Sequence, residues 1–208
     1  RALTHIRDRA VVLAQLKLGL RAGEVCNLRL SDVAIDQADL TEAYPSLGSH
    51  PLVANRNNAV CIPSRYDRSG NKSGRPRVLP LDEELRATLV DLLITRPDTG
   101  ANEVFYTTST HNPLDTEDVR RLWADHFQDD YPETETHRAI TSHFGRHRFT
   151  THWLVNQNWN RELVQYMRGD RIDGVEVSRE AVDSYVHTYY EDVVNMYRED
   201  IYKFDLAE

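Results

Sequence analysis

The spacing of hydrophobic residues predicts a chain made mostly of helices. In several segments apolar residues recur at steps of three and four, which is the pattern of a helix that buries one face. Gly19 ends the first of these segments, and Asp82 stands at the position of a helix N-cap. Helices are therefore predicted over residues 3–18, 22–30, 82–95, 115–129, 141–157, 160–168 and 188–203, with 178–187 as a further candidate.

A small amount of strand is predicted in the first half of the chain. Val33 and Ile35 alternate with polar residues, and residues 59–62 and 77–81 are short apolar runs bounded by turn-forming residues. The stretch 40–58 holds two prolines, a glycine and three asparagines and is expected to be a loop. The predicted fold class is α+β, mainly α with a small antiparallel β-sheet.

Length and composition limit the number of domains and the class of protein. The chain has 208 residues, so residues 1–208 are predicted to form a single domain with ample chain for a core. Hydrophobic residues at 40% and charged residues at 28% are typical of a globular protein. No apolar run approaches the ~20 residues that a membrane-spanning helix needs, and no membrane partner is predicted. Two cysteines are too few for a disulfide framework, which favours a reducing environment.

The kind of basic residue is unusual. The net charge is -8, and of the 25 basic residues only Lys17, Lys72 and Lys203 are lysines. An acidic surface that is poor in lysine favours adaptation to high salt, where hydrated carboxylates keep a protein soluble. The alternative is an ordinary acidic protein from an arginine-rich genome. The acid excess also argues against a general nucleic-acid binder, unless the basic residues are concentrated.

Basic residues are concentrated in two segments. Residues 65–77 carry five cations against Asp67 alone, and residues 138–148 carry three arginines and two histidines with no acid. Such a surface holds phosphates even on an anionic protein, because close contacts are less screened than the distant net charge. The alternative is that both segments are solvated. The residues predicted to contact phosphates are Arg65, Arg68, Arg75, Arg77 and Arg148.

Three further segments supply side chains suited to one phosphate group. Arg21 lies at a turn between two predicted helices, and Lys72 lies between two predicted strands. His143 and Arg146 are three residues apart and so share one helical face. Arginine binds nonbridging oxygens through a planar fork, lysine protonates a leaving oxygen, and histidine exchanges a proton with an attacking hydroxyl. Tyr185 supplies a hydroxyl nucleophile.

Each of these residues also has a purely structural interpretation. Arg21 can pair with Glu24, Lys72 can be an ordinary loop lysine, His143 can cap a helix or fill the core, and Tyr185 can be a core residue. A zinc site is a further alternative, because His143 and His147 are four residues apart. The glutamate of H-E-x-x-H is missing and no C-x-x-C pair is present, so no metal ligand is predicted.

In their order and spacing these motifs resemble the catalytic domain of the tyrosine recombinases, the phage integrase family. The likeness runs from about residue 7 to residue 197, and four motifs in the right order are more specific than any one of them. It implies the fold of that domain, and it implies that the family's N-terminal DNA-clamping domain is absent from this chain. The matching motifs are Arg21 and Glu24 in G-L-R-x-x-E, Lys72 ahead of the strand 77–81, His143 and Arg146 in H-x-x-R, and Tyr185 in Y-x-H.

The resemblance implies site-specific cleavage and rejoining of DNA. Tyr185 would attack a phosphodiester to form a 3′-phosphotyrosyl bond, while Arg21 and Arg146 stabilise charge on the phosphate. Lys72 would protonate the leaving oxygen and His143 would assist proton transfer at the tyrosine, with Glu24 and His147 supporting these groups. Neither ATP nor metal nor any other cofactor is implied. The implied partners are double-stranded DNA and further copies of the chain, as a tetramer on DNA.

The same resemblance implies a location and a source. We expect a cytoplasmic, nucleoid-associated protein of a prokaryote, with a virus or plasmid as one possible carrier of its gene. The resemblance and the acidic, lysine-poor composition together predict a haloarchaeal source.

One position departs from the family's pattern. The family usually has L-G-H, sometimes with tryptophan in place of the histidine, and here Asp170 stands at that place. A carboxylate cannot donate a hydrogen bond to a phosphate oxygen. Asp170 is therefore predicted to orient other groups, or Arg168 or Arg171 takes over the role. A polar insertion over 173–179 follows, which keeps Tyr189 and Tyr190 open as alternative nucleophiles. The alternative functions are a DNA-binding module of the same fold without catalysis, and type IB topoisomerase-like DNA relaxation.

Overall fold

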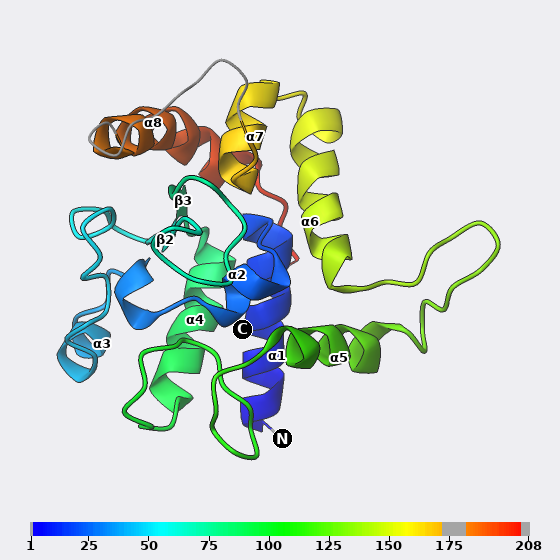
Figure 1. Ribbon diagram of the computed structural model, residues 1–208, viewed down its shortest axis with the longest axis horizontal. Coiled ribbons are helices and arrows are strands. Elements are labelled where there is room, and N and C mark those ends of the chain that lie inside the picture. Colours follow the sequence, from blue (N-terminus) through cyan, green and yellow to red (C-terminus); the bar gives the residue numbers. More distant parts are fainter. Residues whose placement is uncertain (1, 172–181, 205–208) are drawn as a thin grey trace.

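The first helix forms the centre of the fold. In the computed structural model, which describes residues 2–171 and 182–204, helix α1 (Ala2–Leu18) packs against α4 (Glu83–Thr95) and α6 (Ser142–Thr151). Figure 1 shows these helices around a small sheet, with α7 (Arg161–Arg168) and α8 (Val182–Asp200) gathered at one end. The remaining helical elements are α2 (Ala22–Cys26), a 3-10 turn (Leu30–Asp32), α3 (Ala38–Ala43), α5 (Thr116–Phe127) and a π-helical turn (His152–Asn156).

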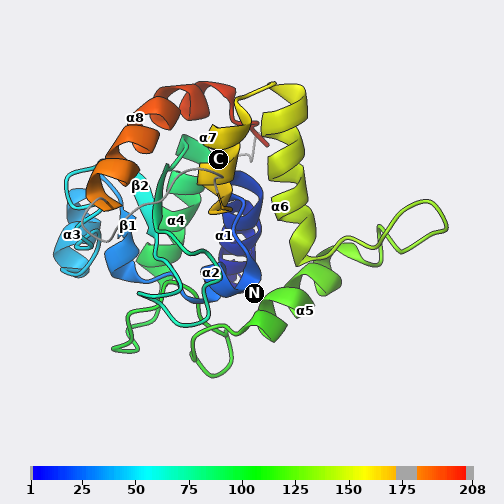
Figure 2. The same ribbon diagram turned by 45° about the horizontal axis from the view of Figure 1, so that its top comes forward.

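The sheet has three short antiparallel strands in the order β1-β2-β3. These are β1 (Val33–Ala34), β2 (Ala59–Ile62) and β3 (Arg77–Pro80), with Val60 opposite Leu79 and Cys61 opposite Val78. Because side chains alternate between the faces of a strand, Val60 and Leu79 enter the main core. Cys61 and Val78 face α8 and pack in a second cluster with Val186 and Tyr190. Both faces are thus covered: α8 packs against β3, and Figure 2 shows α8 beside the sheet.

The predicted fold class is confirmed, and most predicted elements are present. Asp82 caps α4 as expected, since its side chain accepts a hydrogen bond from the Leu85 N–H at 3.3 Å. The helix predicted over 22–30 is shorter, because it ends at Cys26 and resumes as a 3-10 turn. The expected loop 40–58 begins inside α3, a six-residue helix with only Leu40 buried, which leaves no periodic signal to detect.

The last helix joins two segments that were predicted separately. The helix predicted at 188–203 and the candidate at 178–187 meet in one helix, α8, which starts at Val182. Val182, Tyr185, Tyr189 and Val193 form one continuous apolar stripe, which packs on the sheet and on α7. The predicted insertion over 173–179 lies outside the described residues. None of the described helices is long and apolar enough to cross a membrane.

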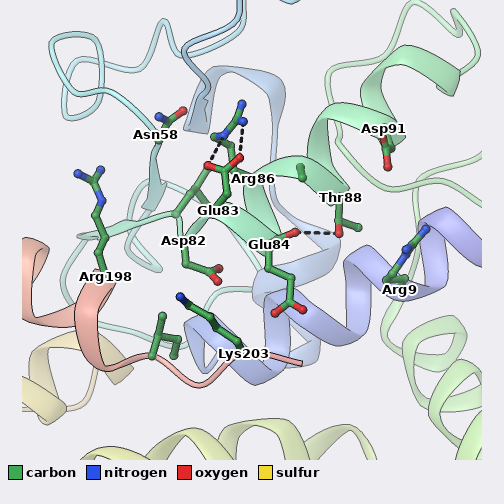
Figure 3. A pocket seen from close by; sticks show the side chains of 13 residues that line it. Arg9, Asn58, Asp82, Glu83, Glu84, Arg86, Thr88, Asp91, Arg198 and Lys203 are labelled. Atoms are coloured by element: carbon green, nitrogen blue, oxygen red, sulfur yellow. Dashed lines mark hydrogen bonds and ion pairs between the residues drawn. The ribbon is translucent and has the colours of Figure 1, made fainter. Parts of the chain in front are cut away.

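A buried lysine fixes the C-terminal segment against the body of the fold. Lys17 is fully buried at the end of α1 and forms ion pairs with Asp82 and, at 2.6 Å, with Glu84. Glu84 in turn accepts hydrogen bonds from the backbone N–H of Phe204 at 3.1 and 3.2 Å. Beside them lies a cavity of about 970 Å³ (Figure 3). None of the predicted site residues is among the residues described as lining it.

The salt adaptation predicted from composition stays a prediction, and α5 with the loop after it is the segment where it is best tested. Residues 115–135 carry eight acids against two arginines, and the loop extends away from the body of the molecule (Figure 1). Salt screens the repulsion among such carboxylates. We therefore expect the melting temperature to rise between low and molar KCl, as measured by circular dichroism. Replacing the exposed Asp129 and Asp130 by asparagine should reduce this rise. A melting temperature that is flat or falls over the range would support the arginine-rich-genome explanation instead.

Candidate phosphate-binding site

The position of Arg21 is set by the turn between α1 and α2. Gly19 ends α1 with φ of 63°, a left-handed conformation that favours glycine. A Cβ at this position would stand 2.7 Å from the Phe149 ring of α6, so the turn lies directly against that helix. Arg21 then precedes α2, and its backbone N–H donates to Glu24 at 2.9 Å. Its guanidinium also reaches Glu24, at 3.3 Å.

Beneath Arg21, a buried ion pair forms the floor of the site. Glu24 accepts two hydrogen bonds from the Arg77 fork, at 3.1 and 2.9 Å, and Arg77 Nε donates to the Met167 carbonyl at 2.8 Å. Burial alone would raise the pKa of Glu24, but the charges and hydrogen bonds of Arg77 and Arg21 together bring that pKa below its ordinary value. The prediction that Arg77 contacts DNA phosphates is wrong, because its side chain is only 1% exposed and is committed to these partners.

Replacing Glu24 by glutamine is expected to lower the free energy of unfolding by about 3–5 kcal/mol at pH 7, because Arg77 would remain buried without a counter-charge. Since the pKa of Glu24 is lowered by folding, its contribution is present above the unfolded pKa of about 4.3 and is lost as pH falls. The difference between the two proteins should therefore shrink in acid. Urea unfolding at several pH values measures it.

The control is Glu83→Gln, because Glu83 pairs with Arg86 while its own side chain is 77% exposed. A surface pair of this kind contributes at most about 1 kcal/mol. Equal losses for both variants would show that the buried pair has no special structural role.

Arg146 reaches the same place from α6. Gly145 lies so close to α1 that a Cβ would stand 3.0 Å from Gln15. This close packing of α6 on α1 brings Arg146 up against the turn at Gly19. Arg146 donates to the Gly19 carbonyl at 2.8 Å. Burial, followed by the neighbouring charges of Arg21 and Arg77, lowers the pKa of Arg146 to about 9, so the guanidinium remains charged at neutral pH.

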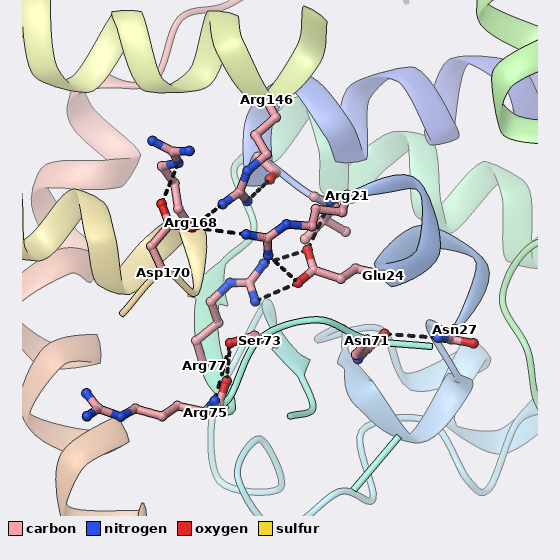
Figure 4. A network of polar contacts seen from close by, with 12 residues as sticks. Arg21, Glu24, Asn27, Asn71, Ser73, Arg75, Arg77, Arg146, Arg168 and Asp170 are labelled. Carbon is pink, nitrogen blue, oxygen red and sulfur yellow. Dashed lines mark hydrogen bonds and ion pairs between the residues drawn. The ribbon is translucent and has the colours of Figure 1, made fainter. Parts of the chain in front are cut away.

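Asp170 lies at the point where the two arginines meet. Its Oδ1 is 3.0 Å from the guanidinium of Arg21 and 2.7 Å from that of Arg146 (Figure 4). Its Oδ2 is 3.1 Å from Nε of Arg168. Gly169 makes this approach possible, because it ends α7 with φ of 65° and a Cβ there would stand 2.4 Å from Arg77. Arg21 and Arg146 are thus brought together as predicted, with Asp170 between them.

A cationic cavity of about 530 Å³ opens in front of this group. Five basic side chains and one acid line it, with Lys72 and Arg75 coming from the connection between β2 and β3. Such a wall of donors binds a phosphate through charge-assisted hydrogen bonds. The lining residues are Arg21, Arg65, Lys72, Ser73, Gly74, Arg75, Gly169, Asp170 and Arg171.

Tyr185 lies in an adjoining cavity of about 590 Å³ that shares Gly74 and Arg75 with the cationic one. Its ring packs edge-on against Tyr166, with ring centres 5.8 Å apart, and the Arg75 guanidinium is 5.4 Å from its centre. Burial raises the pKa of Tyr185, and a hydrogen bond from Arg75 opposes that shift. Arg75 therefore stands between the tyrosine and the phosphate cavity.

Comparison with known proteins identifies the family. The profile of the phage integrase family matches residues 2–190. The chain belongs to the phage integrase family. Among curated proteins no relative matches the sequence.

Solved structures of integrases and recombinases share the fold. The XerA recombinase superposes with a TM-score of 0.55 at 21% identity, covering 98% of this chain and 59% of its own. The Tn1549 transposon integrase in complex with transposon right end DNA gives 0.58 at 16% identity, covering 89% and 59%. The integrase from mycobacterium phage Brujita gives 0.50 at 16% identity, covering 96% and 58%. The chain thus spans less than two thirds of each of these proteins.

Within this phage integrase domain, the alternative tyrosines are held by other contacts. The Tyr189 hydroxyl donates to Glu162, and its ring stacks on Tyr166 with centres 4.9 Å apart. Tyr190 is buried at 5% exposure, with the Arg56 guanidinium 4.9 Å from its ring centre. Of the three tyrosines, Tyr185 is the one that lines a cavity next to the cationic site. It remains the predicted nucleophile.

The predicted histidines lie outside the described lining of the cationic cavity. His143 and His147 are both exposed on α6 and one turn apart, whereas Arg146 on the same helix is buried. In the described part of the chain, no cluster of three or more histidine, cysteine or acidic side chains could hold a metal ion. The roles of His143 as proton carrier and of His147 as a supporting group remain predictions.

Two more predicted phosphate contacts have structural partners instead. Arg68 forms an ion pair with the fully buried Asp32 at 2.9 Å and so holds the hairpin connection to the body. Arg148 lies 4.9 Å from the centre of the Tyr202 ring, against the C-terminal segment. These contacts hold both side chains against the protein, and the prediction that they bind DNA stays a prediction. Arg65 and Arg75 line the cationic cavity and remain candidates.

Sequence reasoning missed two supports of the site. The hydroxyl of Tyr166 donates to the Val78 carbonyl and accepts from the Val78 N–H, both at 3.0 Å, which fixes α7 to β3. Arg75 was predicted to bind phosphate, but its contact with Tyr185 was not foreseen. Tyr166 carried no signal, because a tyrosine within an amphipathic helix is typical of an ordinary core residue.

Proposed function

We propose that this domain cleaves and rejoins DNA strands through a covalent phosphotyrosyl intermediate, with the scissile phosphate held in the cationic cavity. The observation that supports this best is the convergence of Arg21 and Arg146 on one oxygen, at 3.0 and 2.7 Å. Two planar forks aimed at one point match the nonbridging oxygens of a phosphodiester. Lys72, in the same cavity, matches a donor to the leaving oxygen.

The chemistry follows from the roles of these groups. The Tyr185 oxygen attacks phosphorus, a phosphotyrosyl bond to the 3′ end forms, and the bond to the 5′ oxygen breaks. Lys72 gives its proton to the departing 5′ oxygen, and His143 takes the proton of the tyrosine. Arg21 and Arg146 balance the charge that grows on the phosphate oxygens. Attack by a 5′-hydroxyl on the phosphotyrosyl bond reverses these steps and rejoins the strand.

Catalysis requires Tyr185 to move from its place beside Arg75 to the cavity wall. The raised pKa of Tyr185 in its present position means that the phenol is neutral there, whereas the adjoining cationic cavity offers several positive charges that would favour the phenolate. DNA binding that draws Arg75 onto a phosphate would release the ring. The phosphodiester energy is kept in the covalent bond, so the proposed reaction needs neither ATP nor a metal.

Double-stranded DNA is the proposed partner, bound by the connection between β2 and β3. Arg65 and Lys72 are exposed in this connection and line the cavity mouth. Exchange of strands between two duplexes requires several active sites, so we propose a tetramer of the chain on DNA.

The proposed function is tested with nicked duplexes that trap the covalent adduct. A nick close to the cleavage point lets the short 5′-hydroxyl strand diffuse away, so rejoining fails and the adduct accumulates. Because the target sequence is unknown, the substrate is a pool randomised around the nick. We expect a protein–DNA adduct on denaturing gels, and peptide mapping should place the DNA on Tyr185. DNA attached to another residue would overturn the tyrosine assignment.

A second candidate is a DNA-binding module without catalysis. Two observations favour it. Asp170 already binds the arginine pair, and Tyr185 lines the neighbouring cavity rather than the cationic one. The same experiment separates the two candidates. Retention of the duplexes in a gel-shift assay with no adduct at any time would support the binding module.

A further inference from the structure

The carboxylate of Asp170 uses the donors that a phosphate would need. Arg21 directs one end of its fork to Glu24 and the other to Asp170. Arg146 likewise directs one end to the Gly19 carbonyl and the other to Asp170. In each guanidinium group, the end that is not bound to Glu24 or to Gly19 therefore meets the same oxygen, Oδ1 of Asp170. A carboxylate and a phosphate accept the same geometry from arginine, so both cannot hold these donors at once.

Arg168 is a further partner of Asp170, and its Nε lacks a well-aligned hydrogen bond. Nε of Arg168 is 3.1 Å from Oδ2 of Asp170, yet this buried nitrogen makes no aligned hydrogen bond. A buried donor without a partner is costly, and a better bond to it is a gain in free energy. A small rotation of the Asp170 carboxylate toward Arg168 would complete that bond. The same rotation would free the guanidinium groups of Arg21 and Arg146.

We propose that Asp170 is a built-in occupant of the phosphate site, which DNA displaces onto Arg168. This inference rests on the proposed function, because it takes the arginine pair as the phosphate clamp. The clamp is then closed by the protein's own carboxylate in the absence of DNA, and that carboxylate neutralises part of its positive charge. A free anion opens the site only in a fraction of the molecules, whereas a phosphodiester also gains binding energy from the rest of the DNA contacts and opens it fully. Asp170 thereby makes activity depend on full DNA binding.

The displacement has a measurable consequence for anion affinity. The apparent affinity of a ligand falls by the fraction of protein whose site is open. Asp170→Asn keeps the shape of the side chain and removes its charge, so the site should be open in most molecules. We expect inorganic phosphate to bind D170N about tenfold or more tightly than the wild-type protein. Asp170→Ser serves as a second variant in case the amide itself disturbs the fold, and thermal melting checks both.

The control is Asp67→Asn, which changes the net charge by the same amount. Asp67 is exposed, binds the Ser64 hydroxyl at 2.6 Å, and lines the neighbouring cavity rather than the clamp. Isothermal titration with phosphate at constant KCl and pH 6.5 measures all variants, and at that pH Arg146 stays charged. A general charge effect would tighten D67N as much as D170N, and that result would overturn the proposal.

A third variant tests the place to which Asp170 moves. Arg168→Gln removes the charge that receives the displaced carboxylate, so phosphate should bind this variant more weakly than the wild-type protein. In the D170N background, R168Q should weaken phosphate binding less, because residue 170 no longer has a carboxylate that could move to Arg168. Equal losses in both backgrounds would show that Arg168 contacts phosphate directly and that the displacement is wrong.

The experiment also separates this proposal from the proposed function. If Arg21→Lys and Arg146→Lys keep full phosphate affinity in the D170N background, the arginine pair is not the phosphate clamp and the proposed function loses its basis. If these variants lose affinity while D170N and wild type bind phosphate equally, only the displacement by Asp170 is overturned. An orienting role for Asp170 predicts the opposite sign, because D170N would then bind phosphate more weakly and form adduct more slowly.

Discussion

Replacing Tyr185 by phenylalanine is expected to eliminate the covalent protein–DNA adduct. The substitution removes one oxygen, and that oxygen is the proposed nucleophile, so no partial activity should remain. The ring contacts with Tyr166 and Arg75 are kept, and the fold and DNA affinity should be unchanged. Adduct formation on nicked duplexes and a gel-shift titration measure the two properties. In the wild-type protein the cleavage rate should rise with pH through the neutral range, because the phenol, with an ordinary pKa of about 10, must lose its proton to attack.

The matched control is Tyr189→Phe, one turn further along α8. It removes a hydroxyl that donates to Glu162 and should leave adduct formation intact. Tyr190→Phe should behave in the same way, since Tyr190 is buried beside Arg56. An adduct that persists in Y185F and disappears in Y189F would move the nucleophile by one helical turn.

Replacing Arg146 by lysine should slow cleavage by about a hundredfold to a thousandfold, with a modest loss of DNA binding. Loss of one preorganised donor to a developing oxyanion typically costs about 3–4 kcal/mol. Lysine keeps the charge but lacks the planar fork that spans the Gly19 carbonyl and the phosphate site. Arg21→Lys should have an effect of similar size, because Arg21 reaches the same point from α2. Single-turnover cleavage of a nicked duplex gives the rates.

Arg148→Lys is the control, because it makes the same substitution two residues further along α6. Arg148 lies against the Tyr202 ring and away from the cavity, so its replacement should leave the cleavage rate within about twofold of wild type. If R148K slows cleavage as much as R146K, the effect is a general disturbance of α6. If R146K cleaves at the wild-type rate, Arg146 has no role in the phosphate clamp.

Local sequence patterns were enough for the fold class and for most elements. Helices with one buried face repeat at three and four residues, so α1, α4 and α5 follow from the periodicity of the chain. The short α3 does not, because six residues with one buried side chain carry no period. The sequence also divided α8 into a candidate at 178–187 and a helix at 188–203, and the packing of its stripe on the sheet shows that the two are one helix.

The amino-acid sequence alone shows which residue types are available for phosphate chemistry, and the order of the motifs indicates the family. The packing of the chain then separates the arginines that border a cavity from those that are enclosed. Arg77, Arg68 and Arg21 look alike in sequence, yet Arg77 is enclosed with Glu24, Arg68 is bound to Asp32, and Arg21 borders a cavity.

The position of Asp170 was decided in the same way. Its carboxylate meets two guanidinium groups that are 149 and 24 residues away along the chain. Burial and charge pairing depend on neighbours that are distant in sequence, and no local pattern records them.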